Sequence, residues 1–404
     1  MRTVFGIDIS SKTLNVAISV NQNVVNQYKF DNDQIGFDRL LNDLNSVKEP
    51  EIVFEATGVY SRSLQRMLQD HGYQYTCLNP LVAKKQLDSL RPRKTDATDA
   101  FNLAQTQFQF NRKPSYQQDP VYEQLKDLSR FYQEINTDLV RAKTRLHRVL
   151  QLTFPSIERI LSAPNGTLYW NLVKKYPLST MVPVDTTKEL AEIVLSSTDK
   201  RMSQARALKI AVKLQDLAQT CHPAVNNSSS IVKQVHYWAG EALRIQDLKH
   251  ELIQEMTKLA QDQPEYEILL SIPGVGEVTA VLFIAEIGDI RRFTSANKVN
   301  AFVGIDLRHY ESGNYEAADH ISKRGNPYAR KILYQMVMNI VAATSTKSTK
   351  QMHVADYYRN KKQSASSHST KKIAIASMHR LLRTTYILIT KNQKYSYNPT
   401  SKRQ

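Results

Sequence analysis

The first hundred residues alternate short apolar runs with amphipathic stretches. The runs Thr3–Ile9 and 14–20 predict two strands of a hairpin, and Glu51–Glu55 predicts a short buried strand. Further elements are expected as helices at Gln34–Asn45, 62–71 and 95–108 and as a strand at 73–78. The resulting order, ββαβαβα, is typical of an α/β domain with a mixed sheet. The N-terminal domain is therefore expected to cover residues 1–120.

Longer helical patterns follow. Between residues 121 and 152, apolar residues recur on a near-heptad rhythm, which predicts one long helix and a coiled-coil arm. A second heptad pattern over 240–259 predicts a helix that returns antiparallel to the first one. The two helices and the residues between them form the expected long-helix region, 121–265. Prolines and a polar run predict a helical insertion with loops at 155–235 inside it. The remainder is expected to form a mostly helical C-terminal domain, 266–391, and a basic tail, 392–404.

The charge is unevenly distributed along the chain. The sequence has 54 Lys and Arg against 38 Asp and Glu, a formal net charge of +16. Residues 1–120 are nearly neutral, with 14 basic and 13 acidic residues, whereas residues 266–404 have 21 basic and 9 acidic ones. Such an excess favours a polyanionic partner, most simply nucleic acid, bound outside the N-terminal domain.

No apolar run reaches the roughly 18 residues that a membrane span needs, and the N-terminus leads into a strand rather than a signal peptide. We therefore expect a cytoplasmic protein without a membrane partner. Cys77 and Cys221 lie far apart without metal-ligand spacing, so neither a disulfide framework nor a structural zinc site is predicted.

Four acidic residues carry the clearest chemical signal in the N-terminal domain. Asp8 lies among apolar neighbours in a strand and Glu55 ends another buried strand, where an ionised carboxylate is costly unless a positive group binds it. Asp96 and Asp99 in KTDATDA project from one face of a helix. Together these carboxylates can hold two divalent cations for attack on phosphodiesters, and oxygen-only ligands favour Mg²⁺ or Mn²⁺. The order and spacing are typical of a ribonuclease-H-like nuclease core, although a strand bend, a salt bridge or the helix dipole accounts for each element alone.

The C-terminal domain has two segments suited to phosphate binding. The sequence IPGVG, with Gly274 and Gly276, precedes an apolar helix and predicts a helix-hairpin-helix turn whose backbone N–H groups can approach a phosphate. Residues 304–313 (GIDLRHYESG) and 322–326 (SKRGN) predict a polar loop with neighbouring cations. The cations expected to contact nucleic acid are Arg308, Lys323, Arg324, Arg330 and Lys331. A hydroxyl in such a loop can attack a phosphate, but the residues alone do not decide between Tyr310, Ser312, Ser322 and Ser295.

Seven motifs in order carry a resemblance to a known family. They are GIDISSKTLNVAI, VFEATGVY, LNPLVAKK and RKTDATDA, then SIPGVGEVTA, FVGIDLRHYESG and ISKRGNPYARKILY. The chain resembles the DEDD transposases of bacterial insertion sequences, which are bridge-RNA-guided recombinases with a RuvC-like N-terminal domain. The resemblance covers residues 3–152 and 240–390, and the insertion between them is longer than in compact members.

This resemblance implies roles for particular residues and partners. It assigns Asp8, Glu55, Asp96 and Asp99 as metal-binding catalytic carboxylates and Ser312, in the HYESG sequence, as the nucleophile that becomes linked to DNA. It also implies donor and target DNA, a structured guide RNA, and a tetramer of two dimers. The usual Leu-Thr-Pro-Arg-like stretch is 305–308 (IDLR) here, so the loop conformation is expected to differ.

Three other functions remain open. In a RuvC-like hydrolytic endonuclease, water attacks the phosphate and Ser312 is structural. A nucleic-acid-binding protein with a vestigial acidic cluster would bind without catalysis. A tyrosine recombinase using Tyr310 is the least favoured, because no Arg/His/Arg group surrounds that residue.

Overall fold

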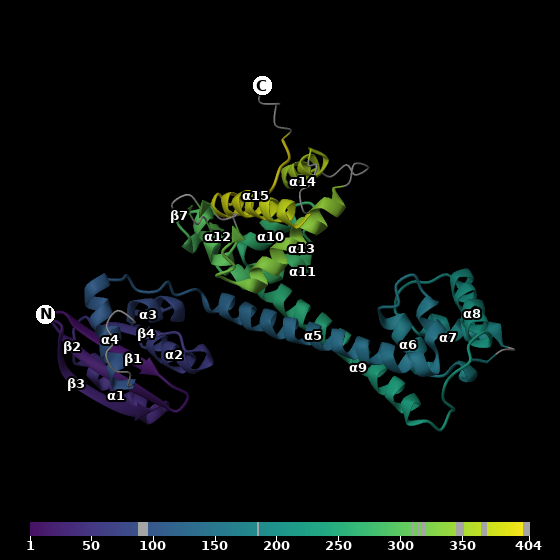
Figure 1. The fold of residues 1–404 in the computed structure, drawn as a ribbon, viewed down its shortest axis with the longest axis horizontal. Helices are drawn as coiled ribbons and strands as arrows, with labels where there is room; N and C mark the ends of the chain where they lie inside the picture. Colours follow the sequence, from purple (N-terminus) through teal and green to yellow (C-terminus); the bar gives the residue numbers. More distant parts are fainter. Residues whose placement is uncertain are drawn as a thin grey trace. The chain divides into compact units, whose positions relative to one another are not determined.

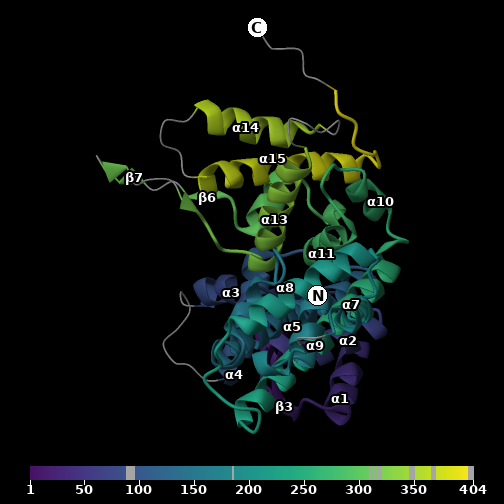
Figure 2. The ribbon, with the colours of Figure 1, turned by 90° about the vertical axis from the view of Figure 1, so that its right-hand side faces the viewer.

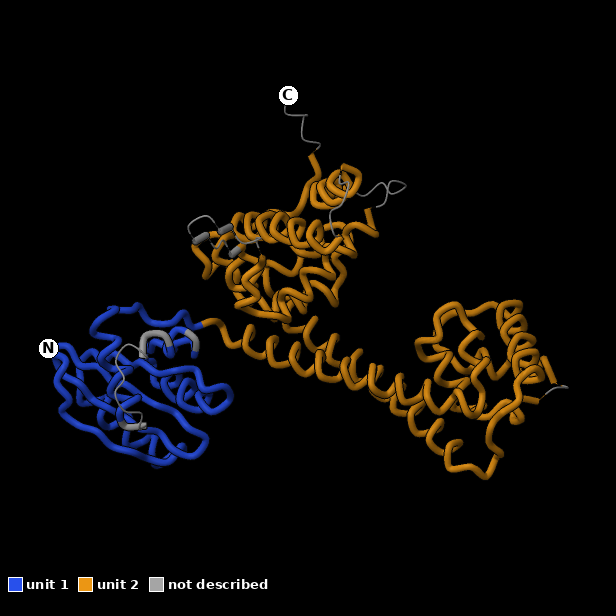
Figure 3. Tube along the Cα trace, viewed as in Figure 1, with its two compact units in different colours: residues 1–117 blue, residues 118–404 orange. Residues whose placement is uncertain are grey.

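The computed structural model describes residues 1–87, 96–183, 186–308, 311–312, 315–316, 320–344, 351–364 and 370–398. The chain divides into two compact units, residues 1–117 and residues 118–404 (Figure 3). The first unit is built on a β-sheet, and the second is mostly helical (Figure 1). Among the described residues, no helix is both long and apolar enough to cross a membrane.

In the first unit, the described residues form a mixed sheet of five strands in the order β3-β2-β1-β4-β5. The first three strands pair antiparallel, whereas β1 with β4 and β4 with β5 pair parallel. This confirms the mixed sheet that the sequence predicts. The strands are β1 (Thr3–Ile9), β2 (Thr13–Val20), β3 (Asn23–Asp31), β4 (Glu51–Glu55) and β5 (Tyr75–Leu78).

The edge strand β3 and the short helix α3 (Pro80–Leu87) were not predicted from the sequence. Most side chains of β3 are exposed, so the strand lacks the apolar pattern by which strands are recognised. Asn21 and Gln22, with φ of 48° and 72°, form the tight turn between β2 and β3. The polar sequence around Asn21 was therefore the available signal for a hairpin.

Apolar side chains pack on both faces of the sheet. One face, with Phe5 and Phe54 at its centre, packs against α1 and α2. The opposite face, with Val4 and Val53, packs against α4. Since side chains alternate between faces along a strand, even-numbered residues of β1 point toward α4. The helices are α1 (Gln34–Asn45), α2 (Arg62–Asp70), which the 3₁₀ turn η1 (Gly58–Ser61) precedes, and α4 (Asp96–Phe110).

Two long helices, α5 (Pro120–Thr153) and α9 (Ser230–Ala260), pack side by side in the second unit (Figure 1). Helix α9 begins ahead of the predicted residue 240, and the side chain of Ser229 caps it by accepting a hydrogen bond from the Ile231 amide. The early part of α5 and the end of α9 share one apolar core with the C-terminal helices, whereas the opposite ends share a second core.

The second core belongs to the insertion, which is helical as predicted. Trp170 lies 2% exposed within it, among apolar side chains of α5, α8 and α9. The elements of the insertion are η3 (Pro155–Arg159), α6 (Thr167–Lys175), η4 (Ser179–Met181), α7 (Thr187–Ser196) and α8 (Gln204–Gln219).

The C-terminal region is mostly helical, and its helices α13, α14 and α15 pack on one another (Figure 2). Within the described part of this region, four strands of two residues each interrupt the helices. The helices are α10 (Pro264–Leu270), α11 (Glu277–Ile287), η5 (Ile290–Arg292), α12 (Ala296–Val303), α13 (Pro327–Ala343), α14 (His353–Ser364) and α15 (Thr370–Thr390).

Candidate functional site

Asp8 and Glu55 lie at the carboxyl ends of adjacent parallel strands. The register of β1 and β4 pairs Gly6 with Val53 and Ile7 with Phe54. Continuing it by one residue sets Asp8 beside Glu55, and neighbouring strands lie about 4.8 Å apart. Gly6 and Val53 lie on the α4 face of the sheet, and side chains two residues apart on a strand point to the same face. The side chains of Asp8 and Glu55 therefore project from the sheet on the α4 face. Both carboxylates are half-buried.

Gly6 lets α4 approach the sheet closely. A Cβ atom at this position would lie 2.1 Å from the carbonyl oxygen of Ala100 and 2.7 Å from the amide nitrogen of Ala104. Any side chain would displace the helix backbone, so the contact requires glycine. Since Asp99 directly precedes Ala100, the contact positions the first turn of α4 over β1, close to Asp8.

Asp99 has an unusual environment for a carboxylate. Its Oδ1 atom is buried and has no hydrogen-bond partner among the residues that the structure describes. Such an oxygen is costly to bury unless a cation or a donor binds it. Asp96 begins the same helix, but its side chain lies outside the described residues. The surroundings of this oxygen are compatible with a cation ligand, and the metal-binding role of Asp99 stays a prediction.

The donor chemistry of this face suits a hard divalent cation, because Asp8, Glu55 and Asp99 offer only carboxylate oxygens. Within the described part of the chain, however, no three Asp, Glu, His or Cys side chains lie close enough together to hold a metal ion. The predicted site also needs Asp96, so the convergence of all four carboxylates stays a prediction.

Cys77 of β5 packs on the α1 and α2 face of the sheet, opposite the face from which Asp8 and Glu55 project. Burial raises the pKa of the Cys77 thiol to about 11, and the negative charge of Glu55 adds to the shift. The thiol is therefore protonated at neutral pH and a poor nucleophile.

The predicted serine loop forms two short β-pairings in the second unit. The strand β6 (Leu307–Arg308) pairs with β9 (His320–Ile321), and β7 (Glu311–Ser312) pairs with β8 (Tyr315–Glu316). Ser312 stands opposite Tyr315. The side chains of Arg308 and Ser312 and the whole of Tyr310 lie outside the described residues, so their roles stay predictions.

The segment 322–326 folds tightly against the end of α12. Lys323 has φ of 52°, and its amide donates to the carbonyl of Gly304 at 3.0 Å. Gly325 has φ of 154°, and a Cβ there would lie 2.4 Å from the Phe302 carbonyl oxygen, so this position requires glycine. Lys323 and Arg324 are exposed, which leaves both charges at the surface as the predicted phosphate contacts require.

Arg330 and Lys331 differ in their surroundings. The guanidinium of Arg330 donates to the carbonyl of Val303 at 2.8 Å, a structural contact that the sequence did not reveal. Lys331 is exposed and donates to the Gln133 side chain at 3.0 Å. Arg330 therefore supports the base of the serine loop, whereas the Lys331 ammonium contacts a neutral partner.

The two glycines of the predicted helix-hairpin-helix turn also differ. Gly274 has φ of 86°, and a Cβ there would lie 2.7 Å from the Cα atom of Ile340, so packing against α13 explains this glycine. At Gly276, a Cβ would have nothing within 4 Å. Open space for a phosphate therefore exists beside Gly276, and the phosphate-binding role of both glycines stays a prediction.

Sequence reasoning missed a buried carboxylate, Glu286 of α11, whose side chain is 0% exposed. It forms a 2.8 Å salt bridge with Arg130 of α5 and accepts hydrogen bonds from Ser129 (3.1 Å) and Asn326 (2.7 Å). Asn326 in turn caps α13 by accepting from the amides of its first turn. The network therefore ties the long helix α5 to the segment that follows the serine loop. An acid within the apolar run EVTAVLFIAEI was the signal for it.

Two family models match the chain. A DEDD transposase model matches residues 5–155, which contain Asp8, Glu55, Asp96 and Asp99. A second model, described as Transposase IS116/IS110/IS902 family, matches residues 266–353, which contain Ser312.

Several curated proteins are similar at low identity. The chain is 34% identical over 97 residues to the transposase for insertion sequence element IS1111A of Coxiella burnetii, which covers 24% of this chain and 27% of the relative. It is 23% identical over 261 residues to the insertion element IS110 uncharacterized 43.6 kDa protein of Streptomyces coelicolor, 63% of each chain. It is also 22% identical over 400 residues to the pilin gene-inverting protein of Moraxella lacunata, 98% of each. The chain thus spans less than two thirds of the first two relatives.

The matched segments contain both the carboxylate face of the first unit and the serine loop of the second. Their order along the chain is the order of the seven motifs. The chain therefore belongs to the IS116/IS110/IS902 family of transposases, with a DEDD domain at its N-terminal end and the family's second domain in its C-terminal region.

Proposed function

We propose that this chain is an insertion-sequence transposase that breaks and rejoins DNA strands through a covalent bond between Ser312 and DNA. The observation that carries the proposal is the pair Asp8 and Glu55, side by side at the carboxyl ends of β1 and β4 on the face that α4 covers. The family models support it, because they match both this face and the serine loop. The first unit is proposed to be a RuvC-like domain.

The proposed ligands of Mg²⁺ or Mn²⁺ are Asp8, Glu55, Asp96 and Asp99. When bound, such ions polarise a phosphodiester and stabilise the oxygen that leaves it. The buried Oδ1 of Asp99, without a partner among the described residues, supports this assignment. The chain itself contributes rigidity, because the strands and the Gly6 contact hold the carboxylates on regular elements rather than on loops.

Ser312 is the proposed nucleophile. Its Oγ forms a bond to phosphorus while the bond from phosphorus to one strand oxygen breaks, and the serine proton ends on the departing strand hydroxyl. A hydroxyl of the partner strand then attacks the same phosphorus, and Ser312 Oγ regains a proton as it leaves. Each step exchanges one phosphodiester bond for another, so no ATP is required.

The proposed partners are donor and target DNA and a structured guide RNA that selects both sites by base pairing. The excess of basic residues in 266–404 supports a polyanionic partner. The proposed assembly is a tetramer of two dimers, in which carboxylates of one subunit act with the serine of another. Sequencing RNA that copurifies with the full chain tests the guide.

Trapping of the covalent protein–DNA adduct tests the proposed reaction. The full chain is incubated with labelled donor DNA and Mg²⁺, denatured, and separated on a gel that resolves protein–DNA adducts. Ser312→Ala is expected to lose the adduct and strand exchange. Asp8→Asn is expected to lose cleavage by at least about a thousandfold, because metal ions contribute several kcal/mol to such reactions.

Ser295→Ala is the matched control, since Ser295 is another hydroxyl of the same domain and should leave the adduct intact. Cleavage that survives Ser312→Ala without any adduct would instead indicate a hydrolytic endonuclease. Strand exchange that survives Asp8→Asn would reject the metal site.

A further inference from the structure

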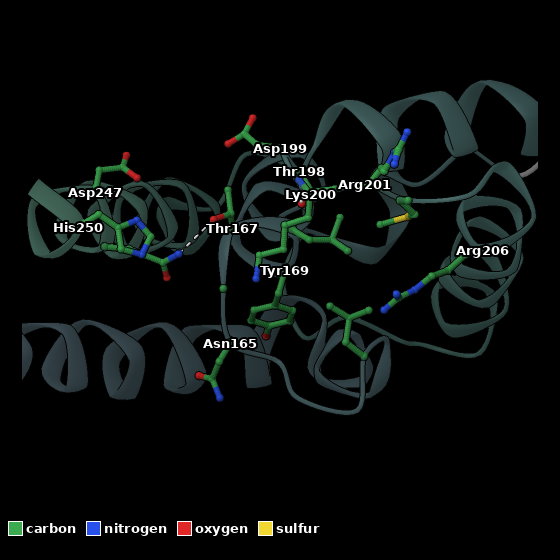
Figure 4. A pocket seen from close by; sticks show the side chains of 15 residues that line it. Asn165, Thr167, Tyr169, Thr198, Asp199, Lys200, Arg201, Arg206, Asp247 and His250 are labelled. Atoms are coloured by element: carbon green, nitrogen blue, oxygen red, sulfur yellow. Dashed lines mark hydrogen bonds between the residues drawn. The ribbon is translucent and has the colours of Figure 1, made fainter. Parts of the chain in front are cut away.

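A groove lies between the insertion and the long helix α9 in the second unit. Two cavities of about 480 and 470 Å³ adjoin there and share five lining residues, among them Lys200 and His250. Figure 4 shows the first of them. The first cavity lies between the start of α6, the segment before α8, and α9. The second continues along α9 to Tyr132 of α5 and Val278 in the first turn of α11. Both cavities together are called the arm groove below.

Positive charge predominates in the arm groove. Its charged lining residues are Lys200, Arg201, Arg206 and Lys249 against Asp199 and Asp247, with His250 beside them. Among the described residues, none of the four cations forms a salt bridge. Figure 4 shows the Lys200 ammonium directed into the groove near Tyr169, whereas the Asp199 carboxylate points away from it. The cations are therefore available to an anion from outside the chain.

Lys249 is the most informative of these cations. Its ammonium donates to the Asn136 side chain at 2.6 Å and lies 5.2 Å from the centroid of the Tyr132 ring, and both neighbours are neutral. Burial lowers the pKa of Lys249, and repulsion from Lys143 of α5 and Lys331 of α13 lowers it further. Three helices thus hold like charges near one another at this end of the groove, an arrangement that an anionic ligand would stabilise.

We propose that the arm groove binds the phosphodiester backbone of a nucleic acid, with Lys200 and Lys249 each contacting a phosphate. The proposal rests on the proposed function for the assumption that the chain handles nucleic acid. Two adjoining cavities that continue along one helix suit an extended chain of phosphates. Lysine ammonium groups act as point charges, so the contacts would add affinity with little sequence choice.

The direction of the arm groove adds to this inference. Val278 lines its far end and lies two residues after Gly276, the open glycine of the predicted helix-hairpin-helix turn. A strand that follows the groove would therefore reach that turn. This gives the insertion a role in substrate binding, which its sequence alone did not suggest.

The test compares the salt dependence of binding in charge-neutralised variants. The full chain, as wild type and as Lys200→Gln/Lys249→Gln, is titrated against labelled duplex DNA, single-stranded DNA and a structured RNA at several salt concentrations. Each lost phosphate contact lowers the slope of log affinity against log salt by about 0.9 for duplex DNA and about 0.7 for single strands. The double variant is expected to lower the slope by the amount that corresponds to two lost phosphate contacts, for the nucleic acid that occupies the groove.

The matched control is Lys188→Gln/Lys233→Gln, which removes two exposed lysines of α7 and α9 that line neither cavity. It should leave the slope unchanged. Thermal unfolding adds an independent readout, because Lys249→Gln keeps a donor for Asn136 and removes a charge repelled by its neighbours. If Lys249 serves ligand binding, the Lys249→Gln variant should bind nucleic acid more weakly without unfolding at a lower temperature.

The outcomes separate this proposal from the proposed function. The proposal for the arm groove is overturned if the double variant has the wild-type slope for all three nucleic acids. It is also overturned if the wild-type chain binds none of them. Asp8→Asn is titrated in parallel and should bind as the wild type does, because binding does not need the chemistry. Loss of strand exchange in Asp8→Asn therefore tests the chemistry alone, whatever the groove variants show.

Discussion

The α4 face of the first unit and the junction of α5, α11 and α13 in the second unit each have a buried carboxylate oxygen on a helix, but the surroundings of the two oxygens differ. Glu286 has a salt bridge with Arg130 and hydrogen bonds from Ser129 and Asn326. Asp99 has a buried Oδ1 without a partner among the described residues. Both oxygens of the Glu286 carboxylate are paired, and these contacts stabilise the packing. The Asp99 Oδ1 atom has no such contact among the described residues, in keeping with the proposed role of Asp99 as a metal ligand.

Glu286 is therefore a buried acid that helps to hold the fold together, whereas Asp99 is an acid that is proposed to bind a ligand. Removing one partner of a satisfied buried pair leaves the other uncompensated, which is strongly destabilising. Removing a charge that lacks a partner relieves a cost. The same kind of substitution should therefore change stability in opposite directions at the two sites.

The largest effect is expected from Glu286→Ala, which should lower the free energy of unfolding of the second unit by about 3 kcal/mol, because it leaves the half-buried Arg130 guanidinium without its carboxylate. Urea denaturation followed by tryptophan fluorescence measures it, since Trp170 and Trp238 both belong to this unit. The exposed pair Glu241 and Arg244 is the control, and Glu241→Ala should change stability by about 0.5 kcal/mol or less.

Asp99→Asn in the first unit is the counterpart of Glu286→Ala. It should leave the free energy of unfolding of the first unit unchanged or raise it by about 1 kcal/mol. Hydrogen exchange of the β1 amides measures it there. A loss of stability as large as that of Glu286→Ala would mean that Asp99 is a structural acid, and the comparison would fail.

An effect smaller than that of Glu286→Ala is expected from Gly6→Ala, which tests how α4 is positioned. The new Cβ would meet the Ala100 carbonyl at 2.1 Å, so α4 must shift, at a cost of about 2 kcal/mol. Slower DNA cleavage and faster exchange of β1 amides should accompany it. The control is Gly240→Ala in the middle of α9, where nothing lies within 4 Å and alanine should stabilise the helix by about 0.5 to 1 kcal/mol. Equal effects at both glycines would contradict the close approach of α4.

The smallest effect on stability is expected from Arg2→Met, which removes the partner of the partly exposed acid Glu51. Hydrogen bonding to Arg2 lowers the pKa of Glu51, with a distance of 2.5 Å between Arg2 Nε and Glu51 Oε1. A lowered pKa gives stability that is present above the ordinary value of 4.5 and lost as pH falls through the folded value. Arg2→Met should therefore cost about 0.5 to 1 kcal/mol at pH 7 and less in acid. Urea unfolding at pH 7 and in acid checks this, and an undiminished difference in acid would refute it.

The sequence predicted the elements whose apolar pattern is strong. The strands β1, β2 and β4 and the helices α1, α2 and α5 lie where the pattern indicated, because each buries one face or one stripe. Helix α9 was predicted only in its later part, over 240–259. It missed β3, since a largely exposed edge strand does not need apolar residues, and α3, a short helix. Charge and motif order also indicated a nucleic-acid enzyme before any contact was known.

Only the tertiary structure revealed why certain residues are needed where they are. The role of Gly6 depends on the Ala100 carbonyl, and that of Gly274 on the backbone of α13, both of which approach from other parts of the chain. Glu286 finds its partners on α5 and before α13, and Lys249 meets like charges from two other helices. A sequence pattern records which residues are buried together, because burial repeats with the period of the element. Contacts between elements have no such period, so which polar groups meet is decided by the packing.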